Sequence, residues 1–203
     1  MIAQTSRMKY FPTVFCITAL SFFVLPGGSA SGATISRHDQ TASGLMGWRV
    51  QDANIQIELN PLQKDQVRAF YLGRGFSVPL TERIAEACVY QVVIENISDP
   101  ETKMPLEVRL SDWRLDGESG PRALPSKDEW ILEWTASGAS AASILAFKWA
   151  TFPSQQDFKL TGDYGWGMML FGNQTGETFD LHLKWYTEGE LVEQFVQGLS
   201  CPE

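Results

Sequence analysis

The sequence predicts a mainly β protein, an antiparallel β-sandwich with an immunoglobulin-like outline that is decorated with three or four short helices. Two observations predict this fold class. Six or seven short segments alternate apolar and polar residues, and turn residues separate most of them at the spacing of hairpins. Capping signals mark only a few short helices between these segments. The alternative is an α+β fold in which helices cover an antiparallel sheet.

A β-hairpin over residues 165–186 is the clearest of the predicted elements. Two apolar runs, GWGMMLFG and TFDLHLKWY, flank the polar connector NQTGE. In the second run, apolar and polar residues alternate from Phe179 to Trp185. Because successive side chains of a strand point to opposite sides, this run is expected to bury one side and expose the other.

The first thirty residues have the layout of a secretory signal peptide. Arg7 and Lys9 precede an almost entirely apolar run over residues 11–25, and the small residues of PGGSASGA follow it. We expect cleavage after Ala30 or Ala33. The apolar run is shorter than the roughly 20 residues of a spanning helix, so we expect no stable membrane insertion after cleavage. The mature protein is therefore expected in the periplasm or outside the cell.

Three regions follow from this assignment. Residues 1–30 form the signal peptide, residues 31–47 a flexible lead-in, and residues 48–203 a single globular domain. The lead-in is predicted because its residues are small and polar. The remainder has the length of one domain and contains no internal repeat.

The first part of the domain is expected to combine strands with two short helices. Alternation within residues 48–59 predicts a strand. Asn60 is a favourable N-cap and Pro61 fits the first helical position, which predicts a helix over residues 61–72. A second helix and a buried β-branched strand are expected over residues 79–87 and 88–97.

The middle of the chain is expected to form a strand, a loop and a third helix. The strand covers residues 106–110 and continues past a bend near Trp113, and residues 116–125 are predicted as a loop. Ser126 and Glu129 form a capping box, which predicts that a helix begins there and ends before Gly138.

The remaining segments are expected to follow the same pattern. Residues 139–151 combine alanines with an alternating end, so we interpret them as a helical turn that runs into a strand. Residues 153–165 are predicted as a loop, and residues 191–199 as the last strand.

Two cysteines, Cys88 and Cys201, remain after export. An oxidising compartment and an even count predict a disulfide between them, and two free thiols or metal ligands are the alternative. The bridge would hold the C-terminal tail against the middle of the chain.

The charge of the mature chain argues against nucleic-acid partners. Loss of Arg7 and Lys9 leaves 14 basic residues against 24 acidic ones. Such a surface repels phosphate backbones, so the expected partner is an envelope protein or a small ligand. The sequence gives no indication of the oligomeric state.

The sequence contains no recognisable catalytic motif. The mature chain has two histidines, and His38 lies in the predicted lead-in, so a serine triad would depend on His182. Neither a CxxC pair nor a zinc ligand set is present. Carboxylates that converge in one cleft could hydrolyse glycosides, although the sequence does not show that any of them do. The five candidates are Glu58, Asp112, Asp116, Asp163 and Glu177. The sequence therefore predicts neither an enzyme nor a cofactor.

Copper is the alternative cofactor. Methionine and histidine are usual copper ligands in exported proteins, and pairing of the predicted hairpin could bring Met168 or Met169 to His182. Only one of the two methionines could lie on the side of His182, because neighbouring strand residues alternate. Methionine between aromatic residues is also a common core filler.

Aromatic residues suggest a binding surface in the stretch DYGWG. The chain has seven tryptophans, and most are expected in the core. Around Tyr164 and Trp166, glycines leave room for rings that contact a ligand or a protein. The leading hypothesis is thus an exported, non-catalytic binding or accessory domain. A copper-binding accessory protein is the second hypothesis, and a hydrolase built on the five acids is the third.

Overall fold

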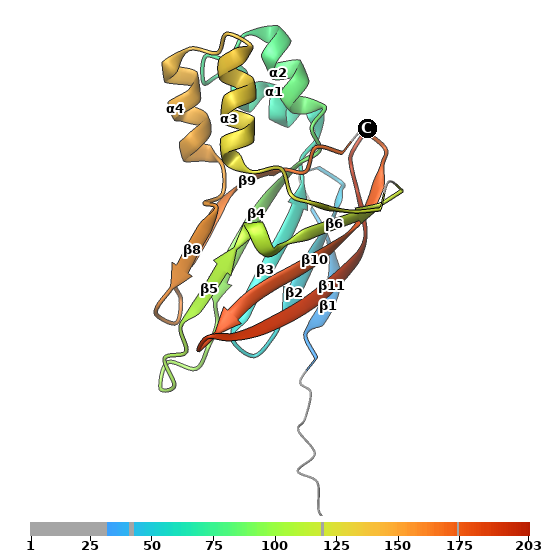
Figure 1. Ribbon diagram of the computed structural model, residues 1–203. Helices are drawn as coiled ribbons and strands as arrows, with labels where there is room; N and C mark the ends of the chain where they lie inside the picture. The colour runs from blue at the N-terminus through green and yellow to red at the C-terminus, as the bar shows by residue number, and fades with distance from the viewer. Residues whose placement is uncertain (1–31, 41–42, 119, 174) are drawn as a thin grey trace, which may run out of the picture. The chain divides into compact units, whose positions relative to one another are not determined.

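The computed structural model describes residues 32–40, 43–118, 120–173 and 175–203. The predicted signal peptide, residues 1–30, lies outside the described residues. Within them the protein is mainly β, with two antiparallel sheets and four helices, so the predicted fold class is confirmed (Figure 1). No helix in these ranges is both long and apolar enough to cross a membrane.

Each sheet combines strands that follow one another in the sequence with strands from other parts of the chain. Sheet A has the order β1-β2-β3-β4-β9, with β1 (Thr34–Asp39), β2 (Met46–Gln51), β3 (Ile55–Pro61), β4 (Val89–Asn96) and β9 (Tyr164–Leu170). Sheet B contains β5 (Leu106–Arg109), β6 (Arg114–Gly117), β7 (Gly120–Ala123), β8 (Gln155–Phe158), β10 (Thr178–Thr187) and β11 (Glu190–Ser200). In sheet B, β10 pairs with β11 along one edge and with β5 and β6 along the other.

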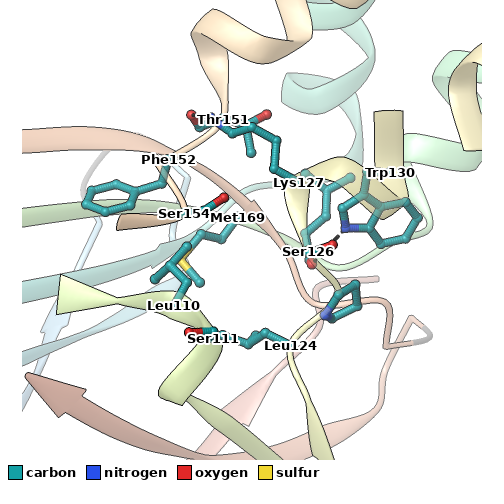
Figure 2. A pocket seen from close by; sticks show the side chains of 12 residues that line it. Leu110, Ser111, Leu124, Ser126, Lys127, Trp130, Thr151, Phe152, Ser154 and Met169 are labelled. Atoms are coloured by element: carbon teal, nitrogen blue, oxygen red, sulfur yellow. Dashed lines mark hydrogen bonds between the residues drawn. The ribbon is translucent and has the colours of Figure 1, made fainter. Parts of the chain in front are cut away.

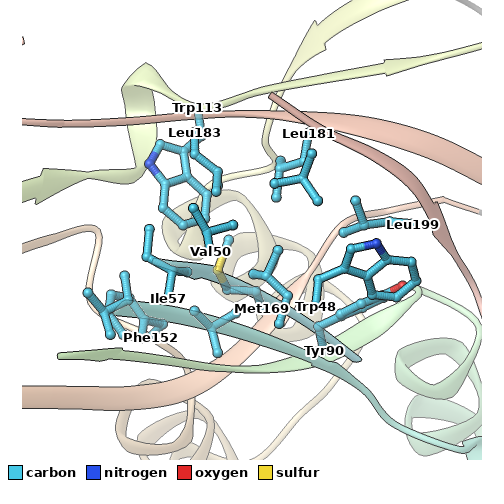
Figure 3. Packing of buried hydrophobic residues seen from close by; sticks show 14 of the residues in the cluster. Trp48, Val50, Ile57, Tyr90, Trp113, Phe152, Met169, Leu181, Leu183 and Leu199 are labelled. Carbon is cyan, nitrogen blue, oxygen red and sulfur yellow. The ribbon is translucent and has the colours of Figure 1, made fainter. Parts of the chain in front are cut away.

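The two sheets pack face to face around one hydrophobic core. Trp48, Val50 and Ile57 of sheet A lie opposite Leu181 and Leu183 of sheet B, and all are buried (Figure 3). Like an immunoglobulin domain, the protein has two antiparallel sheets packed against each other. The connections are particular to this chain, since the first four strands of sheet A are neighbours in sequence order, as in a meander. The alternation predicted for residues 179–185 is confirmed, because the burial of β10 alternates along its length.

Four helices gather at one end of the sandwich in the described part of the chain (Figure 1). They are α1 (Lys64–Leu72), α2 (Val78–Ala85), α3 (Lys127–Ala136) and α4 (Ala141–Ala150), and a 3₁₀ turn, η1 (Leu110–Asp112), follows β5. Their buried faces form a second core in which Tyr71, Trp134 and Phe147 pack with Met168 and Leu170 of β9. The capping box predicted at Ser126 and Glu129 is confirmed at the start of α3.

A disulfide joins Cys88 to Cys201, as the cysteine count predicts, with 5.1 Å between the Cα atoms. Cys88 precedes β4 in sheet A, and Cys201 follows β11 in sheet B. Beside the bridge, the Tyr90 hydroxyl donates to the Ser200 carbonyl oxygen at 2.6 Å and accepts from the Ser200 amide at 3.1 Å. The end of the chain is thus fixed to both sheets by one covalent bond and two hydrogen bonds.

The prediction of a β-hairpin over residues 165–186 is wrong. Its two strands form, but β9 pairs with β4 in sheet A and β10 pairs with β5, β6 and β11 in sheet B. The segment between them crosses from one sheet to the other instead of turning back. Alternation fixes which side of a strand is buried, and it does not fix the neighbour, so both partners satisfy the same pattern.

The N-terminal part of the domain differs from the predicted lead-in over residues 31–47. Thr34–Asp39 form β1, which pairs with β2 along its whole length. Most side chains of β1 are exposed, so its sequence lacks the alternation of apolar and polar residues from which a strand is predicted. Backbone pairing with β2 holds the strand in the sheet. The first predicted helix also begins later than expected, at Lys64, because Pro61 completes β3 and Gln63 serves as the N-cap.

Three further segments differ from the sequence-based expectations. The loop predicted over residues 116–125 contains β7, which pairs with β6 as a hairpin. Within residues 139–151, the continuous helix α4 (Ala141–Ala150) replaces the predicted helical turn and strand. The loop predicted over residues 153–165 contains β8, which pairs with β5. Both added strands are only four residues long and half-exposed, so their alternation is weak.

Candidate functional site

Tyr164 and Trp166, the predicted ligand-binding residues, lie at the start of β9 on the side of sheet A that faces away from the core. They oppose Glu95 and Val93 of β4, whereas Gly165 and Gly167 between and after them face inward. A Cβ atom on Gly167 would lie 2.4 Å from the Phe152 backbone nitrogen, so only glycine permits this close approach. The glycines thus bring the sandwich core close to β9 and leave both aromatic rings on the outer side.

Both aromatic side chains are largely exposed, at 68% for Tyr164 and 53% for Trp166. Further along the same side of β9, Met168 and Leu170 are buried beneath the helices. The helical layer therefore covers one half of β9 and leaves the half that carries the two rings uncovered.

The backbone of this half of β9 is also open along one edge. β9 is the last strand of sheet A, and Phe152 N donates to Met168 O on the side away from β4. Because backbone groups alternate in an antiparallel pair, those of Tyr164 and Trp166 point to the same side. Within the described residues, no backbone hydrogen bond satisfies them there.

Trp149 is a further exposed aromatic residue near this edge, and it was missed as a site residue in the sequence. It lies in the last turn of α4 with 82% of its surface exposed. A single β-bridge pairs Thr151 with Met168. Trp149 precedes Thr151 by two residues, and Trp166 precedes Met168 by two residues. Two residues span at most about 7 Å, so both tryptophans lie close to this bridge. The alternation of residues 147–151 suggested a strand, which concealed the helical exposure of Trp149.

On the other side of β9, the structure forms a small cavity that was not predicted (Figure 2). It has a volume of about 100 Å³ and lies between η1, the segment that leads into α3, and the segment that leaves α4. Figure 2 shows Trp130 across this hollow from Met169 and Leu110. Trp130 stacks on Trp134, with ring centroids 5.3 Å apart, and this contact fixes one wall.

Lys127 is the charged side chain of this cavity. Its Nζ donates to the carbonyl oxygens of Thr151 at 2.9 Å and Lys148 at 3.2 Å. Burial lowers the pKa of the Lys127 ammonium, and the neighbouring Asp128 carboxylate opposes that shift. In the sequence Lys127 is simply the first residue of a helix, and no local signal could have identified its position in a cavity wall.

The three residues of the copper hypothesis do not come together. Met169 faces the core of the sandwich, Met168 packs under the helices, and both belong to sheet A. His182 lies on the outer side of sheet B, where its ring contacts that of Phe195 at 4.3 Å between centroids. The hairpin pairing on which this ligand set depended does not exist. In the described part of the chain, no three His, Cys, Asp or Glu side chains form a group that could hold a metal.

The five acids considered for hydrolysis lie on different elements. Glu58 pairs with Arg49 on sheet A, and Asp112 accepts a hydrogen bond from the Tyr186 hydroxyl at 3.0 Å. Asp163 accepts from the amides of Lys159 and Leu160 in the turn before β9. None of the three lines the cavity beside Lys127. These carboxylates support local structure.

Comparisons with protein-family models, with curated proteins and with solved structures find no match to this chain.

Proposed function

We propose that this chain is an exported, non-catalytic binding domain that holds an extended segment of a partner protein along the open edge of β9. The observation that carries the proposal is the coincidence of two features at Tyr164 and Trp166. Their side chains are exposed, and their backbone groups form an edge that lacks partners within the described residues.

Export is supported by the signal-peptide layout of residues 1–30 and by the Cys88–Cys201 disulfide, since such bonds persist in oxidising compartments. The compartment proposed is the periplasm or the exterior of the cell. The disulfide fixes the C-terminal tail, which suits a domain that has to stay folded in such a compartment before its partner binds.

Strand addition is supported by the composition of the β9 edge. Proteins usually protect an edge strand with charged residues, proline or a bulge. The stretch YGWGMML has none of these, and its pairing with β4 is regular. A partner strand could therefore form main-chain hydrogen bonds with Tyr164 and Trp166, while its side chains contact their rings.

The expected partner segment is extended, carries apolar side chains and is basic. The rings of Tyr164, Trp166 and Trp149 offer a large apolar contact area at low entropic cost. The domain without its signal peptide has 14 basic and 24 acidic residues, so its field attracts a basic partner and speeds the encounter.

A site-specific crosslinker tests the proposal. A photoreactive amino acid in place of Trp149 in the full chain, produced in cells of the source organism, is expected to give one discrete adduct with another protein. Tyr164→Pro removes an outward-facing amide without touching the β4 ladder, and Trp166→Lys adds a charge beside the edge. Both changes are expected to abolish the adduct.

Leu191→Lys is the matched control, because Leu191 is an exposed apolar residue on the distant strand β11. This variant is expected to keep the adduct. Persistence of the adduct in both edge variants would refute docking along β9. An adduct with twice the mass of the chain would mean that the crosslinked partner is a second copy of this chain, and it would also reject the proposal.

A further inference from the structure

The cavity beside Lys127 has the chemistry of a binding site for a small molecule. Its walls are mainly apolar, and they come from Leu124, Trp130, Phe152, Met169 and other residues of four separate segments (Figure 2). Apolar cavities accept apolar ligands. Tyr164, Trp166 and Trp149 are not among the residues that line the cavity, so the site is distinct from the edge surface described above.

The charge in the cavity wall is unbalanced. Lys127 is the charged residue among those that line it, and no carboxylate is among them. An ammonium group has three donors, and the carbonyl oxygens of Thr151 and Lys148 take two. In the part of the chain that the structure describes, no side chain or backbone oxygen takes the third. The site therefore combines an apolar chamber with a lysine in its wall whose ammonium has two protein acceptors in the described residues.

The volume limits the size of the ligand. A cavity of 150 Å³ holds benzene, which corresponds to about 25 Å³ for each carbon atom. The cavity here, about 100 Å³, therefore has room for a tail of about four carbon atoms.

We propose that the cavity binds a short-chain monocarboxylate, with its hydrocarbon tail against Met169 and Leu124 and its carboxylate at the Lys127 Nζ. The tail gains from leaving water, and the carboxylate takes the third donor of the ammonium as a charge-assisted hydrogen bond. A neutral molecule of the same shape uses the chamber alone and binds more weakly.

Methyl-labelled methionine provides the readout. Valerate is the probe, and it is added to the folded domain with its disulfide intact while methyl NMR spectra are recorded. The Met169 methyl is expected to shift in a saturable way. The Met168 methyl faces the helices on the opposite side of the same strand and is the internal control. Absence of a saturable Met169 shift, or an equal shift of Met168, would refute the site.

Two sets of variants separate the roles of charge and chamber. Lys127→Met is expected to raise the Kd of valerate about tenfold and to change that of pentanol, its neutral counterpart, by less than about threefold. Lys127→Arg is expected to restore most of the valerate affinity. Equal losses for valerate and pentanol in Lys127→Met would refute the role assigned to the ammonium.

Leu124→Trp fills the chamber and is expected to abolish binding of both probes. Ser154→Trp at the exposed rim is a second occluding variant, in case the first one perturbs folding, which near-UV circular dichroism reports. Valerate binding that survives in both folded variants would place the ligand elsewhere and reject the proposal.

Discussion

The Nζ of Lys127 lies 2.9 Å from the carbonyl oxygen of Thr151, so the first residue of α3 closes the C-terminal end of α4. A second bond, to the carbonyl oxygen of Lys148, satisfies another backbone acceptor of the last helical turn. A cation at this end also interacts favourably with the helix dipole. The contact therefore joins α3, α4 and the start of the segment that leads into sheet B.

Removal of this contact is expected to destabilise the domain. Lys127→Ala leaves two carbonyl oxygens at the end of α4 without their donor, and we expect a loss of about 1–2 kcal/mol in the free energy of unfolding. Urea denaturation measures the loss. Lys148→Ala is the control, because it removes an equal charge at the end of α4 and keeps the backbone acceptor. Its effect on the free energy of unfolding is expected within about 0.5 kcal/mol. Similar losses in both variants would contradict the assigned role.

The disulfide is expected to supply a large share of the stability. Its residues are 113 positions apart, and the chain-entropy model gives about 4–5 kcal/mol for a loop of this length. Reduction, or the double change Cys88→Ala and Cys201→Ala, should therefore lower the midpoint of urea denaturation substantially. Reductant should have no further effect on the double variant. An unchanged midpoint after complete reduction would contradict the prediction.

Local signals in the sequence predicted the elements that depend on local chemistry. The capping box of Ser126 and Glu129 works through two hydrogen bonds within one turn, so its meaning does not depend on the rest of the fold. The burial side of β10 follows from alternation alone. The bridge between Cys88 and Cys201 followed from the cysteine count and the expected compartment.

Features that depend on distant neighbours could not be predicted in this way. The alternation of β9 and β10 is compatible with pairing in either sheet, and only the complete set of strands places them in different ones. The cavity beside Lys127 similarly requires η1, α3, α4 and β9 to meet at one point. The exposure of Tyr164 and Trp166 was suggested by their glycine neighbours, whereas the open edge beside them follows from the topology.

Two buried tyrosines are expected to respond in opposite ways to loss of the hydroxyl. The Tyr90 hydroxyl is bonded to Ser200 twice, and its removal in Tyr90→Phe should cost about 1–2 kcal/mol. The buried Tyr71 hydroxyl has no hydrogen-bond partner within the described residues, so Tyr71→Phe should be neutral or stabilising. Thermal and urea denaturation of the two variants measure the difference. A larger loss in Tyr71→Phe would contradict the assignment.

The same two tyrosines are expected to make the domain sensitive to alkaline pH. Burial raises the pKa of both phenols in the folded state, and for Tyr90 the bond to Ser200 opposes part of that shift. In the unfolded chain they ionise near pH 10, so the unfolded state loses protons first as the pH rises. The contribution of the two tyrosines to the free energy of unfolding should therefore be constant below about pH 10 and fall above that pH. The double variant Tyr71→Phe, Tyr90→Phe should show a shallower fall, and the exposed control Tyr164→Phe should not.

Two glycines of β9 allow the packing of the strand against the sandwich core to be tested. A Cβ atom on Gly167 would lie 2.4 Å from the Phe152 nitrogen and 2.5 Å from its Cα, and these backbone atoms cannot yield without breaking the bond from Phe152 N to Met168 O. Gly167→Ala is therefore expected to cost at least about 2 kcal/mol.

Gly165→Ala is the matched control for this change, because it lies on the same strand and faces the same way. Its Cβ atom would lie 3.5 Å from the Phe158 ring, which is an ordinary contact. Both substitutions restrict the unfolded chain equally, so that contribution cancels in the comparison. Urea denaturation should show Gly165→Ala within about 1 kcal/mol of the parent protein and well above Gly167→Ala. Equal stabilities would mean that β9 does not approach the Phe152 backbone in solution, and both the cavity wall and the exposed edge would then have to lie elsewhere.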